Sequence, residues 1–341
     1  MANETEIYVK EQRRYNFLLL VGIISVIAVF VMSLCLGNFT TSPREVLSAI
    51  THPDIYPQIY MIVTRSRLPR LLAATLVGAS LSVAGLTYQE IFSNKMASPD
   101  LLGVSAGAGV GASVSIYMGA GFLLTSTFAF IGGLAAVGLT IVASKLFSGN
   151  SRSVASLILA GIVVGGLMNS LLGLFKYLSN DSQLASITFW LLGGFYSTTY
   201  HQLTFATPLI VIGIIVLMLL RWNIVMLRSG DADAYAHGIN AKVVRRICIT
   251  ITTIITSVSI CISGTIGWIG LAIPNLMRLL VHNDGRKLMP LAIVYGALFA
   301  EICDLLARTI TNTEIPVGII TGFIGAIMFI LVLVIQTTRS K

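Results

Sequence analysis

Carboxylates inside apolar stretches are the first residues to consider for chemistry, because ionisable groups in a membrane span are usually functional. Glu301 and Asp304 are the candidates, and both fall within one long apolar run. Such a pair can carry the coupling ion of a proton- or sodium-driven transporter. Arg308 follows Asp304 four positions later, so on a helix the two side chains share a face and are able to pair. The pattern leaves both interpretations open.

Other reactive side chains show no catalytic or metal-binding spacing. The four histidines lie far apart, and the cysteines are scattered within apolar runs without a CxxC spacing, which is typical of small buried side chains. The sequence also lacks the GxxxxGK[ST] loop that cradles nucleotide phosphates. We therefore expect no metal site, no bound cofactor and no enzymatic activity in this chain. The cysteines are Cys35, Cys248, Cys261 and Cys303.

The elements that must position these residues are apolar helices. The chain has 341 residues, of which 55% are hydrophobic and 11% are charged, and its mean hydropathy is +0.88. A water-soluble globule exposes too much of its surface to hide this composition. At roughly 20 residues per crossing, the length allows about ten spans in a single all-α membrane domain, residues 1–341. The predicted spans are 17–36, 71–88, 101–118, 122–147, 154–175, 203–220, 247–263, 271–281, 291–307 and 317–335.

The basic residues indicate the topology. The net charge is +8, but Lys and Arg stand at the ends of apolar runs instead of forming a stripe, which argues against nucleic-acid binding. With the N-terminus inside, most of them fall on the inner side, as the positive-inside rule requires. We therefore expect both termini to be cytoplasmic. The first apolar run lacks a small-residue cleavage site and is expected to remain as a span. An amphipathic segment near residues 189–200 is too short to cross and is expected to lie at the interface.

A weak internal repeat relates the two halves. Residues 67–85 and 244–264 share a basic start, an apolar run and a closing glycine. The first begins outside and the second begins inside, which predicts inverted halves with the transport pathway between them. The halves cover about 17–175 and 247–336.

The longest inner loop, residues 221–246, contains a short predicted helix at 231–237 between two glycines. Acidic residues at its start suit the helix dipole. The helix is either a knob that fits a groove on a partner or an ordinary connector. The segment comprises Gly230, Asp231, Ala232, Asp233, Ala234, Tyr235, Ala236, His237 and Gly238.

Several segments, in order and spacing, resemble the FecCD-type permeases of bacterial ABC importers for iron chelates and cobalamin. The resemblance runs over almost the whole chain. The segments are RLPR from Arg67, GASLSVAGLTYQEIFSNKMASPDLLGVSAGAG from Gly78, FWLLGG from Phe189, GDADAYAHGIN from Gly230, SGTIGWIGLAIPNLMR from Ser263, DLLAR from Asp304 and IPVGIITGFIGAIMF from Ile315.

The resemblance implies the type II ABC importer permease fold in the cytoplasmic membrane of a bacterium. It implies a second permease subunit, identical or paralogous, with the pathway at the shared axis. It also implies two cytoplasmic ATPase subunits, which bind ATP and Mg, and an external solute-binding protein or lipoprotein. The solute is then expected to be a ferric siderophore, with haem or cobalamin as alternatives. An ion-coupled secondary transporter and a non-transporting membrane scaffold are the rival classes.

The resemblance also assigns residues. Arg67, Arg70 and Arg308 match outward-facing arginines that meet acidic residues on the binding protein, and 231–237 matches the helix that docks on the ATPases. Asn94 and Met96 match positions near the inner gate. Three residues depart from the family pattern: Lys95 stands where proline is usual, Asn275 where histidine follows a proline, and Ile327 where the last helix has a proline.

Overall fold

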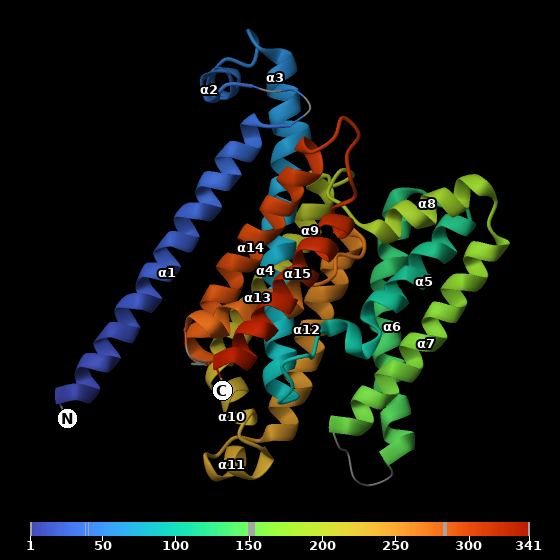
Figure 1. Ribbon diagram of the computed structural model, residues 1–341. Helices are drawn as coiled ribbons and strands as arrows, with labels where there is room; N and C mark the ends of the chain where they lie inside the picture. Colours follow the sequence, from blue (N-terminus) through green and yellow to red (C-terminus); the bar gives the residue numbers. More distant parts are fainter. Residues whose placement is uncertain (1, 38, 40, 149–153, 282–284, 340–341) are drawn as a thin grey trace.

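The computed structural model describes residues 2–37, 39, 41–148, 154–281 and 285–339, which form helices and no strand. Figure 1 shows a long, tilted bundle. The helices are α1 Ala2–Cys35, α2 Pro43–Thr51, α3 Pro57–Met61, η1 Ile62–Arg67, α4 Leu68–Ile91, η2 Pro99–Leu102, α5 Val104–Tyr117, α6 Phe122–Ser148, α7 Val154–Leu178, α8 Asp181–Leu192, α9 Tyr200–Leu219, α10 Arg221–Leu227, α11 Asp231–Ala236, α12 Ala241–Ser263, α13 Ile269–Leu280, α14 Gly285–Thr309 and α15 Val317–Arg339.

The predicted apolar segments are all present as helices in the described parts of the chain. Eight helices there are long and apolar enough to cross a membrane, and α5 and α13 are shorter apolar helices in the places of the third and eighth predicted spans. The all-α, multi-span fold is therefore confirmed. In the amphipathic segment, α8 ends at Leu192 and α9 begins at Tyr200. Its place at the membrane interface stays a prediction.

The second span begins earlier than the sequence predicts. Helices α3, η1 and α4 follow one another without a break over Pro57–Ile91. The π-helical turn η1 lies just before Pro69, which has no backbone N–H to continue a regular ladder. Arg67 therefore lies within a continuous helical segment, where the charge pattern had indicated a loop.

Helix α4 forms the centre of the bundle. In the most apolar 18-residue stretch of the span that contains α4, 83% of the residues are buried, compared with 11% in the span formed by α1. Glycines bring its backbone against two neighbours: a Cβ on Gly78 would lie 2.3 Å from the Gly296 carbonyl oxygen of α14, and one on Gly85 would lie 1.9 Å from the Gly270 oxygen of α13. Such small faces let helices associate closely in lipid, where the hydrophobic effect does not drive association.

Helices α5, α6 and α7, with α8, form a second group beside the group around α4 (Figure 1). Close backbone approaches also hold this group, since a Cβ on Gly107 would meet the Gly132 oxygen at 2.4 Å. The connector that carries η2 leads from the end of α4 into the second group.

The two ends of the bundle differ. At one end lie α2, α3 and the loop between α14 and α15, and we call this the arginine end because Arg67, Arg70 and Arg308 lie there. At the other end lie α10 and α11, and we call this the loop end. Figure 1 shows the first turns of α1 and the last turns of α15 toward the loop end.

Candidate functional site

A buried ionic cluster joins α4 to α14 at the arginine end. The Nε atom of Arg70 lies 2.7 Å from Oδ1 of Asp304, and its Nη1 atom lies 2.7 Å from Oε2 of Glu314. The Nε atom of Arg308 lies 3.1 Å from the second oxygen of Asp304. The predicted Asp304–Arg308 pair is thus confirmed, and Arg70 extends it to a second helix. In an apolar setting a charge needs such partners, because burying it alone is very costly.

Arg67 and Arg308 also hold the chain that leaves α1. Arg67 Nη1 donates to the carbonyl oxygen of Leu34 at 2.5 Å, and its other amino group donates to the carbonyl of Phe39. Arg308 Nη2 donates to Oγ of Ser33 at 2.5 Å. These contacts satisfy groups at the end of α1, where backbone carbonyls have no partner within the helix.

The three arginines expected to dock the binding protein are buried within this subunit, and a docking role for them stays a prediction. Arg67, Arg70 and Arg308 are 5%, 6% and 4% exposed, respectively. Their guanidinium groups are turned into the subunit because Asp304, Glu314 and the end of α1 offer acceptors there. Exposed cations at this end are instead Arg44 on α2 and Arg65 on η1.

Glu301 has a different environment from Asp304. It is fully buried on α14, and its Oε1 atom accepts a hydrogen bond from the Thr75 hydroxyl at 2.6 Å. Its Oε2 atom has no hydrogen-bond partner. Since Asp304 is bound by two arginines, Glu301 is the one of the two sequence candidates that lacks a cationic partner among the described residues.

A second ionic cluster, absent from the sequence prediction, lies at the other end of α4. Arg278 of α13 lies 2.7 Å from Glu90, and it also donates to the Gln89 side chain. Gln89 in turn donates to the Gly270 carbonyl at 3.1 Å. The sequence does show a charged residue in the last turn of each of two apolar spans, Glu90 and Arg278. No local spacing connects the two residues, so their pairing could not be predicted.

The segment after α4 carries the residues expected near the inner gate. The Asn94 side chain accepts a hydrogen bond from the Met96 backbone at 2.9 Å, and both side chains are exposed. Asn275 donates to the carbonyl of Lys95 at 2.9 Å, so it ties this segment to α13. Two departures from the family pattern thus contact each other. The third, Ile327, is 45% exposed on α15. A gating role for Asn94 and Met96 stays a prediction.

The inner loop contains the predicted helix, as α11, preceded by α10. Gly230 and Gly238 adopt positive φ angles of 111° and 75° on either side of it, which glycine adopts without steric cost. Arg245 of α12 lies 2.8 Å from Asp231, and this hydrogen-bonded charge lowers the pKa of the Asp231 carboxyl. Tyr235 projects from the helix and is 80% exposed. The helix is therefore anchored at its start and presents a free face at the loop end.

The fold and these charges define a multi-span helical membrane protein with buried ion pairs. The chain belongs to the FecCD transport family, whose profile matches residues 25–335. Similar proteins differ in what their names say they carry. A "Probable iron chelatin transport system permease protein" of Helicobacter pylori is 35% identical over 87% of this chain and 90% of that protein. The "Molybdate import system permease protein MolB" of Haemophilus influenzae is 33% identical over 88% and 90%. The "Vitamin B12 import system permease protein BtuC" of Salmonella arizonae is 32% identical over 95% and 96%.

A solved structure has the same fold over nearly the whole chain. It is described as an inward-facing conformation of a metal-chelate type ABC transporter, and it superposes with a TM-score of 0.83 at 30% identity, covering 92% of this chain and 98% of that one. The predicted family and fold are therefore confirmed.

The cluster around Asp304 yields a stability prediction. Asp304→Asn should lower the free energy of unfolding by about 3–5 kcal/mol, because it leaves Arg70 and Arg308 buried with less compensating charge. Thermal and chemical unfolding of the purified permease in detergent measure this. Glu314→Gln is the matched control: its side chain is 38% exposed, so the loss should stay within about 1 kcal/mol. Equal losses in the two variants would show that burial of the pair is not decisive.

Proposed function

We propose that this chain is the membrane-spanning subunit of an ATP-driven importer that carries a ferric siderophore into the cell. Membership of the FecCD family carries this proposal. The names of the relatives include iron chelate, molybdate and vitamin B12 transport at similar identity, so identity alone does not select the cargo. An iron chelate is preferred because the most similar of these three relatives and the matched structure are named for chelates. Cobalamin and haem are the alternatives within the same class.

The energy source in this proposal is ATP on partner subunits. The sequence has no GxxxxGK[ST] phosphate loop, so in this proposal the nucleotide is bound by the partners. In the proposal the loop end is cytoplasmic, and α11 docks on a dimer of ATPase subunits. A second permease subunit covers exposed helices such as α7 and α15, whose most apolar windows are 22% and 28% buried within this chain.

The arginine end is external in this proposal and receives the solute-binding protein. The buried arginines support that surface from within, because they fix the end of α1 against α4 and α14. Arg44 and Arg65 are exposed at this end and are the cations available to acidic residues of a receptor. Contacts of this kind mainly steer association and set orientation.

Uptake by the complete transporter tests the cargo and the energy source together. Proteoliposomes with the permease, its ATPase and its binding protein should take up labelled ferric siderophore when ATP is inside. Glu301→Gln should retain transport, because the driving force does not pass through this carboxyl. Uptake that persists without ATP and is abolished by Glu301→Gln would establish the ion-coupled alternative. Labelled haem, cobalamin and molybdate in the same assay identify another cargo if the siderophore is not transported.

Tyr235→Ala tests the coupling role of α11. Its ring is exposed on the helix, so truncation should leave the permease folded but reduce ATP-driven uptake by about tenfold, a loss typical of an exposed aromatic anchor at an interface. Basal ATP hydrolysis by the complex should be reduced far less than uptake. Tyr196→Ala, at a tyrosine of the segment between α8 and α9 that is 59% exposed, is the control. Full coupling in Tyr235→Ala would favour a plain connector.

Receptor docking is tested by reversing exposed charges. The double variant Arg44→Glu, Arg65→Glu should slow association of the binding protein by about tenfold at low salt, with the difference shrinking as salt is added. Surface plasmon resonance with the permease in nanodiscs measures both rates. The double variant Arg221→Glu, Arg246→Glu, at exposed positions toward the loop end, changes the net charge by the same amount and is the control. Arg67→Glu should instead destabilise the fold. If the Arg67→Glu protein folds normally and fails only to bind the solute-binding protein, Arg67 contacts that protein directly.

A further inference from the structure

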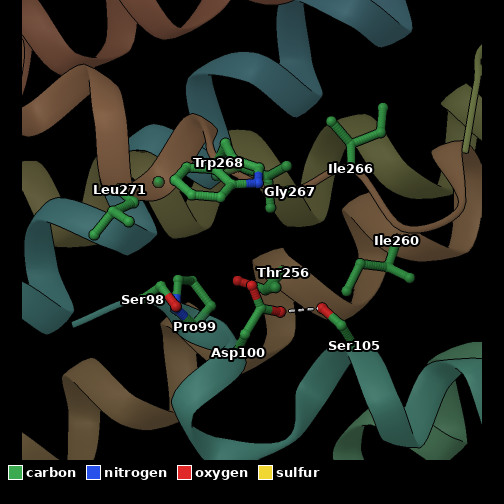
Figure 2. A pocket seen from close by; sticks show the side chains of 12 residues that line it. Ser98, Pro99, Asp100, Ser105, Thr256, Ile260, Ile266, Gly267, Trp268 and Leu271 are labelled. Carbon is green, nitrogen blue, oxygen red and sulfur yellow. Dashed lines mark hydrogen bonds between the residues drawn. The ribbon is translucent and has the colours of Figure 1, made fainter. Parts of the chain in front are cut away.

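A cavity of about 180 Å³ lies where α4, η2, α5, α12 and the segment before α13 meet (Figure 2). One water occupies roughly 10–15 Å³ on this measure, so the cavity is many times larger than a single water site. It lies beside the connector between the two helix groups. Its lining includes Asp100, Ser105, Thr256 and Trp268.

The carboxylate of Asp100 is exposed into this cavity. It accepts a hydrogen bond from the Ser105 hydroxyl, drawn as a dashed line in Figure 2. Within the described part of the chain, no basic side chain lies at ion-pair distance from it. The other carboxylates of the bundle interior differ, since Asp304 and Glu90 are paired with arginines and Glu301 is enclosed.

A second polar group at the cavity lacks a partner. Thr256 of α12 is 1% exposed, and its hydroxyl oxygen makes no hydrogen bond within the structure. Leaving a buried hydroxyl unpaired is unfavourable. The Thr256 oxygen has less than 1 Å² of accessible surface, so an occupant of the cavity meets the oxygens of Asp100 and Ser105 instead. The Asp100 carboxylate has acceptor capacity that no described residue fills.

An indole ring closes the opposite side. Figure 2 shows Trp268 across the cavity from Asp100. Its backbone has a φ angle of 71°, which is rare for a bulky residue, and its ring packs near Phe329 of α15 with ring centroids 6.4 Å apart. A Cβ on Gly325 would lie 2.6 Å from the Trp268 Cβ. The ring therefore packs against α15 on one side, while the residue is 40% exposed.

We propose that this cavity binds a protonated primary amine of the cargo, an inference that rests on the transport function proposed above. An ammonium group has three donors and a positive charge, which suit the Asp100 carboxylate and the Ser105 hydroxyl oxygen on one side and an aromatic ring on the other. A divalent metal requires more oxygen ligands than this set offers. An oxyanion such as molybdate is repelled by the unpaired carboxylate. The geometry thus selects amine-bearing ferric chelates within the iron-chelate class.

A matched pair of chelates tests this proposal. Ferric ferrioxamine B carries one free amine that is protonated at neutral pH, and its N-acetyl derivative differs by loss of that charge. Equilibrium dialysis with radioactive iron and the purified permease in nanodiscs should show at least about tenfold tighter binding of the amine form, the size expected for a charged hydrogen bond. Asp100→Asn should remove most of that preference, and Ser105→Ala should reduce it. Asp54→Asn, an exposed acid at the arginine end, should preserve it.

The outcomes separate this proposal from the transport function. Equal affinity for both chelates in the wild-type protein overturns the amine site, while receptor-stimulated uptake of either chelate still supports the importer. If glycerophosphoethanolamine binds to the permease and neither chelate does, the assignment to cargo is overturned and the site is one for a lipid headgroup. If potassium or sodium ions displace the labelled amine chelate as effectively as the unlabelled amine chelate does, the choice of a primary amine as ligand is overturned. Circular dichroism of each variant establishes that lost preference does not reflect unfolding.

Discussion

The structure depends on one constraint: charges buried among apolar helices must be paired, and helix α4 carries such pairs at both of its ends. Arg70 bonds to Asp304 of α14 at one end, and Glu90 bonds to Arg278 of α13 at the other. Between them, Gly78 and Gly85 allow backbone contact with the same two helices. A register shift of α4 along either neighbour would separate charges and create steric overlap together, so each constraint reinforces the other.

This central helix explains how the remaining parts are placed. The arginines at its first end bind the end of α1 and the loop after α14. Its second end leads through residues 93–98 to η2 and the second group of helices, and Asn275 of α13 fixes that segment by a hydrogen bond. Arg245 of α12, which anchors α11, also donates to the carbonyl of Ile91 at the end of α4. The loop end, the cavity and the arginine end are therefore all attached to one element.

The sequence predicted the apolar elements well, because the length and composition of a span are local properties. The short helix at Asp231 was also predictable, since glycines and acidic residues in its first turn mark its boundaries locally. The orientation of the arginines was not. A cluster of basic residues normally indicates a loop in water, whereas the partner that draws Arg70 inward lies 234 residues away. The Glu90–Arg278 pair, 188 residues apart, and the cavity at Asp100 escaped prediction for the same reason.

The glycine contacts of α4 limit how the molecule is able to change shape. Backbone atoms touch at two levels along the helix, with α14 at Gly78 and with α13 at Gly85, and contacts without intervening side chains leave little room for sliding. Helices α4, α13 and α14 therefore behave as one rigid body. The connector at 93–103 departs from helical geometry at Ser93 and Gly103, whose φ angles are 49° and 79°. The Asp100 cavity beside it is lined by residues of both helix groups, so an occupant there would contact both of them.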